Sequence, residues 1–182
     1  MFRFFVTLQM KTYNKILIMK KTIVIYGSST GTCEGLAAQI AEKLGVELID
    51  VTALTSEVVA EHDNLILGTS TWGDGELQDD WVDGLPLLEG ADLSGKTIAL
   101  FGCGDSSSYE DTFCDAMREI KDAVAGSGCR FIGAFPTDGY MATESRAVEN
   151  GMFVGLALDE MNEFDQTADR IEKWIGMIEP EL

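Results

Sequence analysis

The sequence predicts an α/β protein: a three-layer α/β/α sandwich around a five-stranded parallel sheet. Short apolar runs alternate with helix-like patterns along nearly the whole chain. The runs Ile23-Val24-Ile25-Tyr26 and Leu65-Ile66-Leu67 have no polar alternation, which is typical of parallel strands buried on both faces. At 182 residues the chain fits one domain with a full core.

The first strand leads into a glycine- and hydroxyl-rich loop, residues 27–33, and then into a helix over 32–44. The loop lacks the lysine of a P-loop, and its glycines lie four residues apart, unlike those of a dinucleotide fingerprint. Two interpretations remain open. The loop and the helix N-terminus bind a terminal phosphate, or the loop is an ordinary turn with Thr30 or Thr32 as N-cap.

The other elements follow in order. We expect strands over 46–51, 65–69, 97–102 and 130–135, and helices over 56–61, 79–88, 111–125 and 163–178. Pro86 should end or break the helix over 79–88. Residues 137–162 are too long for a simple connection. Their apolar residues Phe153, Val154, Leu156 and Leu158 indicate that the segment folds against the edge of the sheet.

Three loops follow the carboxyl ends of strands, where open parallel sheets bind ligands. They span residues 27–33, 70–75 and 103–110, and the last two present Trp72 and Tyr109. Two aromatic side chains beside a phosphate site indicate a planar ligand held between rings.

The chain resembles the flavodoxins from about residue 20 to residue 177. The resemblance is carried by Gly27-Ser28-Ser29-Thr30-Gly31-Thr32, by Ser70-Thr71-Trp72-Gly73-Asp74-Gly75 and by Phe101-Gly102-Cys103-Gly104-Asp105 with Tyr109. Residues 138–140 and 153–160 add to it. Residues 137–162 resemble the insertion of the long-chain type, which implies that they interrupt the last strand and that this strand resumes near residues 155–158. The resemblance implies the strand order 2-1-3-4-5, which is general for the flavodoxin-like fold.

The resemblance also implies bound FMN and assigns its contacts. The phosphate would lie against Ser28, Ser29, Thr30, Gly31, Thr32 and Cys33. Trp72 and Tyr109 would enclose the flavin ring, whose edges would meet Ser70, Thr71, Gly73, Asp74, Gly75, Cys103, Gly104 and Asp105. Cys33 departs from the family pattern, which has a threonine there, and a thiol is the weaker donor.

The implied function is that of a low-potential one-electron carrier, not an enzyme, which shuttles electrons between redox enzymes through the semiquinone and hydroquinone states of FMN. Acidic residues near the 70–75 loop should disfavour added negative charge on the flavin. The alternative is an FMN-dependent NAD(P)H:quinone-type reductase. A phospho-receiver domain is excluded, since Gly27-Ser28 stands where its acid pair would be.

The charge of −18, from 13 basic and 31 acidic residues, excludes nucleic acid and anionic membranes as partners. It favours basic docking patches on a reductase and on acceptor oxidoreductases. Four widely spaced cysteines and a single histidine argue against a metal site and for a reduced, cytoplasmic protein, which we expect to be monomeric.

Residues 1–18 differ in composition, with three basic residues and no acid. We expect an N-terminal extension there, arising from a mis-assigned start or forming a loose tail, and a domain over 19–182. The lone histidine, His62, is far in sequence from the three loops and is expected on the surface.

Overall fold

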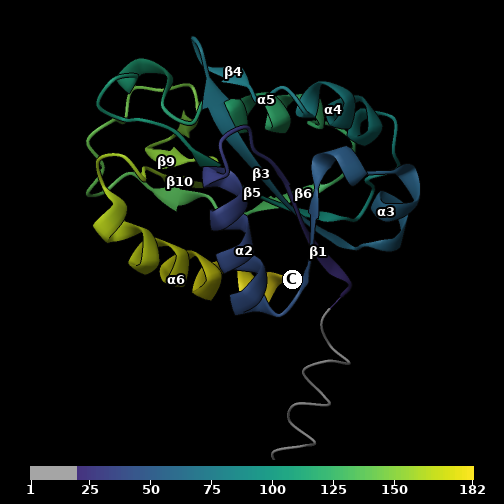
Figure 1. Cartoon of the computed structure of the whole chain (residues 1–182). Helices are drawn as coiled ribbons and strands as arrows, with labels where there is room; N and C mark the ends of the chain where they lie inside the picture. The colour runs from purple at the N-terminus through teal and green to yellow at the C-terminus, as the bar shows by residue number, and fades with distance from the viewer. Residues whose placement is uncertain (1–19) are drawn as a thin grey trace, which may run out of the picture.

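The computed structural model describes residues 20–182, so the expected extension over 1–18 lies outside the described residues. The central sheet contains the parallel strands β1 (Thr22–Gly27), β2 (Glu47–Asp50), β3 (Asn64–Trp72), β5 (Thr97–Cys103) and β10 (Leu156–Leu158). Their order is β2-β1-β3-β5-β10. Numbered as the strands of the parallel core, this is the expected order 2-1-3-4-5. Figure 1 labels β1, β3, β5 and β10 of this sheet.

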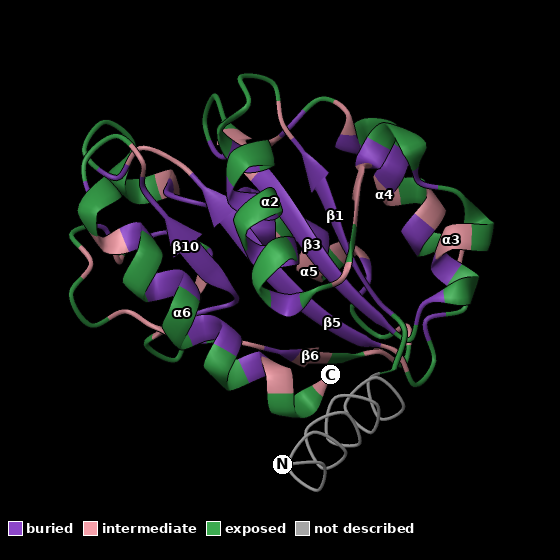
Figure 2. Ribbon diagram, turned by 60° about the horizontal axis from the view of Figure 1, so that its bottom comes forward, coloured by how far each residue is buried: buried purple, intermediate pink, exposed green. Residues whose placement is uncertain are grey.

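Helices cover both faces of the sheet (Figure 2). On one face α2 (Thr32–Leu44) and α6 (Thr167–Ile178) bury Leu36, Ile40 and Trp174. On the other lie α3 (Ser56–Glu61), α4 (Trp81–Glu89) and α5 (Ala116–Ala123). The strands send alternate side chains into the two cores: Ile23 and Ile25 pack on one side, Val24 and Tyr26 on the other. This two-residue alternation explains why the strands are apolar throughout.

The edge strand next to β5 is divided. β6 (Arg130–Ile132) pairs with the first half of β5, and β10 pairs with the second half, in the register Leu156↔Phe101. The chain turns away after β6 at Gly133, whose φ of 78° lies in the left-handed region that side chains disfavour. The single strand expected over 130–135 is therefore wrong, whereas the resumption near 155–158 is confirmed.

Between the two halves the chain forms a small antiparallel sheet of β7 (Phe135–Pro136), β8 (Val148–Glu149) and β9 (Met152–Phe153). Its side chains pack into the main core. The ring of Tyr140 lies 4.8 Å from that of Phe153, and its hydroxyl donates to the Ala157 carbonyl at 2.7 Å. Arg170 of α6 lies 3.6 Å from the centre of the Tyr140 ring and pairs with buried Glu163 at 2.7 Å. These contacts hold the insertion against the sheet.

Three helix expectations are wrong in detail. The helix expected over 163–178 begins only at Thr167, after a 3₁₀ turn, Phe164–Gln166. Pro86 lies inside α4, where it neither ends nor breaks the helix. Pro86 has no N–H to donate to the Val82 carbonyl, so one helical hydrogen bond is missing. Val82 is 68% exposed, so this face of α4 is open to solvent. The helix expected over 111–125 begins only at Ala116, after a 3₁₀ turn, Glu110–Thr112, and a left-handed residue, Cys114, with φ of 60°.

His62 is buried rather than on the surface, with 3% of its area exposed. Its Nδ1 lies 2.7 Å from the Val58 carbonyl, and its Nε2 lies 3.3 Å from a carboxylate oxygen of Glu47. His62 therefore connects the C-terminal end of α3 to β2, and it lies far from the three glycine-rich loops. Within residues 20–182 no helix has the length and apolar character needed to cross a membrane.

Candidate functional site

A pocket of about 270 Å³ lies where the strands β1, β3 and β5 end. The three loops expected to meet there all contribute to it. Ten of the expected site residues line it: Thr30, Thr32, Ser70, Thr71, Trp72, Gly73, Cys103, Gly104, Asp105 and Tyr109. Parallel strands bring their carboxyl ends to one edge of the sheet, which is why loops far apart in sequence meet here.

One end of the pocket is the N-terminus of α2. The helix begins at Thr32 and its N-cap is Gly31, with φ of 88°, so no side chain of the cap accepts a hydrogen bond from the first turn. The interpretation with Thr30 or Thr32 as N-cap is therefore wrong. Ser28 Oγ accepts from the Gly31 amide at 3.1 Å, and Ser29 Oγ accepts from Gln78 Nε2 at 3.2 Å. The first-turn amides of a 13-residue helix are thus left available for an anion.

The other end of the pocket is flanked by two aromatic side chains. Trp72 at the end of β3 is 43% exposed, and Tyr109 in the loop after β5 is 55% exposed. Trp72 Nε1 donates to Ser70 Oγ at 2.9 Å, which fixes the indole. Gly73 follows with φ of 51°, in a turn closed by the Gly75 amide on the Trp72 carbonyl at 3.1 Å. A flat aromatic ligand would cover both exposed faces.

Asp105 also lines the pocket and is held as a carboxylate. Its Oδ1 accepts from the amides of Ser107 and Ser108 at 3.0 Å and from Asn162 Nδ2 at 2.8 Å. The hydrogen bonds from Ser108 are the main cause that keeps the pKa of Asp105 below its ordinary value, with Asn162 and Ser107 adding to them against a smaller effect of burial. An acceptor is thus fixed at the edge of the pocket.

The remaining expected site residues do not line the pocket. Ser28, Ser29 and Gly31 form the turn that leads into α2. Asp74 is exposed, and Gly75 is buried against Asp115 and Thr112. Cys33 is fully buried behind the loop. A hydrogen bond with the Cys103 thiol, together with burial, raises the pKa of Cys33 well above its ordinary value, so this thiol remains protonated.

Five lining residues were not expected from the sequence: Thr112, Phe113, Cys114, Glu160 and Met161. The first three face the pocket because the chain unwinds before α5 instead of continuing as a helix. The last two arrive from the segment after β10. Glu160 was part of the flavodoxin-like motif over 153–160 and Met161 follows it, but only the pairing of β10 with β5 shows that this motif ends beside the 103–110 loop.

The residues present fit a phosphorylated, planar aromatic group. An uncapped helix N-terminus provides neutral donors at one end, and two half-exposed rings provide apolar faces at the other. Comparison with known proteins decides the family. Residues 24–174 match the model of the family described as flavodoxin. The chain belongs to the flavodoxin family.

Individual flavodoxins match over nearly their whole lengths. "Flavodoxin 1" of Azotobacter vinelandii is 42% identical over 173 residues, which cover 90% of this chain and 98% of that protein. "Flavodoxin 1" of Escherichia coli K12 is 41% identical, covering 90% and 96%. The crystal structure of Fusobacterium nucleatum flavodoxin bound to flavin mononucleotide superposes with a TM-score of 0.84 at 35% identity, covering 90% of this chain and 99% of that one.

Acidification of this flavodoxin should protonate Asp115 before Asp105 and Asp159. Burial raises the pKa of Asp115. For Asp159, burial also acts to raise the pKa, but hydrogen bonds from Ser106 and Asn162 outweigh it and leave the pKa lowered. Because Asp105 and Asp159 have depressed pKa values when folded, they stabilise the fold above the ordinary aspartate pKa of about 3.9 and lose this effect as the pH falls through their folded values.

Carboxyl-carbon NMR of the protein between pH 7 and pH 2 checks this order. Asp105 and Asp159 should titrate below about pH 3.9, and Asp115 above it. A midpoint for Asp159 above that of Asp115 would contradict the hydrogen bonds from Ser106 and Asn162 to Asp159.

Proposed function

We propose that the pocket between α2, Trp72 and Tyr109 binds FMN, and that the chain is an electron carrier working between redox enzymes. The observation that carries the proposal is the pairing of an uncapped helix N-terminus with two half-exposed rings across one pocket. Membership of the flavodoxin family supports it.

Different residues of the pocket contact different parts of FMN. The amides of the first turn of α2, with the hydroxyls of Thr30 and Thr32, hold the phosphate. Trp72 and Tyr109 cover the ring, and Asp105 with the backbone of Cys103 and Gly104 meets its polar edge. FMN, when bound, supplies reversible one-electron and two-electron chemistry, so the protein needs no nucleophile or general base of its own.

The protein's contribution to the redox chemistry is electrostatic. None of the described residues that line the pocket is basic, whereas Asp105 and Glu160 are acidic. Asp74 and Glu76 are exposed beside it. A site of this charge, covered by aromatic rings that exclude water, disfavours a further negative charge. The flavin is therefore held at low potential, which suits a strongly reducing electron donor.

Binding and turnover assays test the function. The purified protein should take up one FMN, with quenching of flavin fluorescence, and bind riboflavin more weakly because the α2 contacts are lost. The reduced protein should pass electrons to a c-type cytochrome. Failure to bind FMN would overturn the proposal. Rapid oxidation of NADPH by the protein with a quinone alone would instead show a reductase.

The partners of this flavodoxin are oxidoreductases, and we infer that they dock through basic patches onto the acidic rim of the pocket. Asp74, Glu76, Glu110 and Asp111 are exposed there, beside Trp72 and Tyr109. The high net negative charge supports electrostatic steering of a basic partner and a monomeric carrier that releases it readily. The four free cysteines support a reducing, cytoplasmic setting.

Neutralising Glu110 and Asp111 together should slow electron transfer to a basic c-type cytochrome about tenfold at 10 mM salt and by much less at 500 mM salt. At low salt the Debye length is about 30 Å, and at high salt it falls to a few ångströms, so the steering is screened. Stopped-flow kinetics measure both rates.

The matched control replaces Glu42 and Glu89 with glutamine. Both side chains are exposed at the ends of α2 and α4, by the amino ends of the strands. The control has the same net charge as the rim variant. Equal rates for the two variants would show that total charge, and not a docking surface beside the pocket, governs the encounter.

A further inference from the structure

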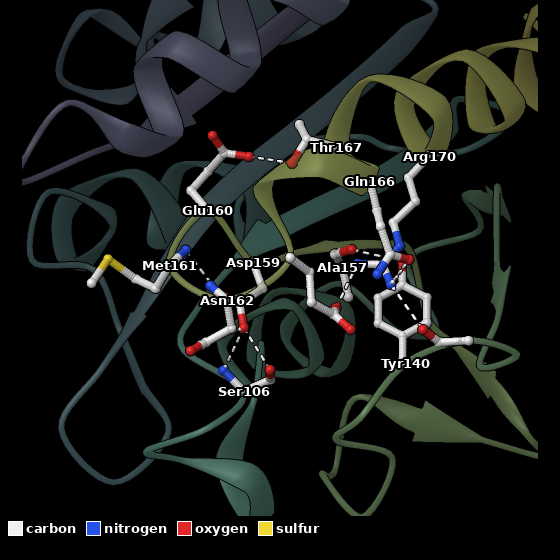
Figure 3. Close-up of polar contacts among 12 residues, drawn as sticks. Ser106, Tyr140, Ala157, Asp159, Glu160, Met161, Asn162, Gln166, Thr167 and Arg170 are labelled. Carbon is white, nitrogen blue, oxygen red and sulfur yellow. Dashed lines mark hydrogen bonds and ion pairs between the residues drawn. The ribbon is translucent and has the colours of Figure 1, made fainter.

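The segment after β10, residues 159–162, is bonded to the loop that carries Asp105 and Tyr109 (Figure 3). Asp159 is fully buried. Its Oδ2 accepts from the Ser106 amide at 2.9 Å and from the Ser106 hydroxyl at 2.5 Å. Two segments separated by more than 50 residues are therefore joined through one carboxylate.

The same carboxylate organises its own segment. Its Oδ1 accepts from the amides of Met161 and Asn162, both at 2.9 Å, and so forms a tight turn. That turn places the Asn162 side-chain amide between two acids. Asn162 Nδ2 donates to Asp159 Oδ2 at 2.9 Å and to Asp105 Oδ1 at 2.8 Å. Hydrogen bonds thus run without a break from Asp159 to Asp105.

This network ends at the pocket. Asp105 Oδ1 fixes the amides of Ser107 and Ser108, and the Asp105 carbonyl accepts from the Tyr109 amide at 3.1 Å. Glu160 and Met161 of the Asp159 turn line the pocket directly. Asp159 itself is absent from the lining, so it has no direct contact with a ligand there. Of the residues that donate to it, Met161 lines the pocket, and Ser106 and Asn162 are the sequence neighbours of the lining residues Asp105 and Met161.

The energetic reason for such an arrangement is pre-organisation. A glycine- and serine-rich loop that is free in the unliganded protein must be ordered when a ligand binds, and this cost reduces affinity. A buried carboxylate that accepts five hydrogen bonds orders the loop beforehand. Removing one acceptor leaves donors unsatisfied, which is costly in a buried site.

We propose that Asp159 is a positioning residue for the flavin ring: it holds the 105–109 loop and the 160–162 turn in the shape that receives the ring, without touching it. The proposal rests on the proposed function, since it assigns the ring to this end of the pocket. It makes affinity for the ring, but not for the phosphate, depend on a residue outside the pocket.

Asp159→Asn is the sharpest test. The asparagine oxygen can retain the two amides of the turn, but its NH₂ group would then face the Ser106 amide and the Asn162 amide, donor against donor. Affinities for FMN and for riboflavin should both fall about tenfold or more, as expected for one lost charged hydrogen bond. Binding of inorganic phosphate should be unchanged. Asp165→Asn, the same change at an exposed site nearby, should alter none of the three.

Amide hydrogen exchange in the flavin-free protein gives a readout that does not need the cofactor. In Asp159→Asn, the amides of Ser106, Ser107 and Ser108 should exchange at least tenfold faster than in Asp165→Asn. Asn162→Ala serves as the second variant, should the first fail to fold. It removes the side-chain bonds of Asn162 to Asp105 and to Asp159 and leaves the bonds from Ser106 and from the backbone amides of the turn to Asp159. Riboflavin affinity should therefore fall while the Ser106 amide stays protected.

The outcomes separate the two proposals. If the unmodified protein binds neither FMN nor riboflavin, the proposed function fails, and unchanged exchange at Ser106–Ser108 in Asp159→Asn would overturn the positioning role as well. If the unmodified protein binds both and Asp159→Asn matches it, only the positioning role is overturned. Equal loss of riboflavin and phosphate binding would show a general structural role instead.

Discussion

Replacing Gly155 with alanine is expected to lower the free energy of unfolding by about 3 kcal/mol. A Cβ at this buried position would lie within 3.0 Å of the Leu100 carbonyl group, closer than Cβ atoms come to other heavy atoms. The obstacle is backbone of the central strand β5, which cannot move as a side chain can. The start of β10 would be pushed off β5, and the Leu156↔Phe101 register would be lost. Urea denaturation followed by circular dichroism measures the change.

Gly176→Ala provides the matched control. Gly176 lies exposed in α6, and an added Cβ there would meet nothing within 4 Å. Alanine should raise stability by about 0.5–1 kcal/mol, because it restricts the unfolded chain and favours the helix. If Gly155→Ala were as stable as the unmodified protein, the tight contact between the resumed strand and β5 would be wrong.

Removing both aromatic side chains of the pocket, in Trp72→Ala/Tyr109→Ala, should weaken FMN binding on the order of a thousandfold. Aromatic stacking on a heterocyclic base is worth about 1–3 kcal/mol per side chain by alanine substitution, and every 1.4 kcal/mol is a factor of ten. Each single variant should lose part of this affinity. Isothermal titration calorimetry with FMN gives the dissociation constants.

The stability of the flavin-free double variant should stay within about 1 kcal/mol of that of the unmodified protein, since Trp72 and Tyr109 are 43% and 55% exposed and contribute little to the core. Phe164→Ala controls for loss of an aromatic side chain, because Phe164 is 69% exposed and lies outside the pocket lining. Retained tight FMN binding in the double variant would mean that the flavin ring lies elsewhere.

The local patterns predicted the repeating architecture well. The helices over 32–44 and 56–61 match α2 and α3 residue for residue, and the three binding loops follow the strands that the apolar runs indicate. These features depend on periodicity and on turn residues, which act over a few neighbours along the chain. The errors lie where distant contacts override local preference. The pattern over 111–125 is helical, yet Cys114 takes a left-handed conformation and turns Phe113 into the core.

Part of the site was beyond local reasoning for the same reason. Trp72 and Tyr109 could be predicted because each is an aromatic residue in a loop that follows a strand, and Trp72 is followed by the permissive Gly73. Glu160 and Met161 reach the pocket only because β10 resumes the divided strand. Cys33 stands at a position that the family motif assigns to phosphate contact, but its thiol is buried next to Cys103. Side-chain direction in the first turn of a helix depends on what the helix packs against.

The sequence by itself determined the alternation of strands and helices, the glycine-rich loops, the family and the charge. Each of these features depends on residues that are neighbours along the chain or on the overall composition. Only the tertiary structure decided that no side chain caps α2, where the edge strand divides and how Asp159 reaches Ser106. Those features depend on hydrogen bonds between segments that are dozens of residues apart. The free energy of such contacts exists only after the chain has closed the loops between them.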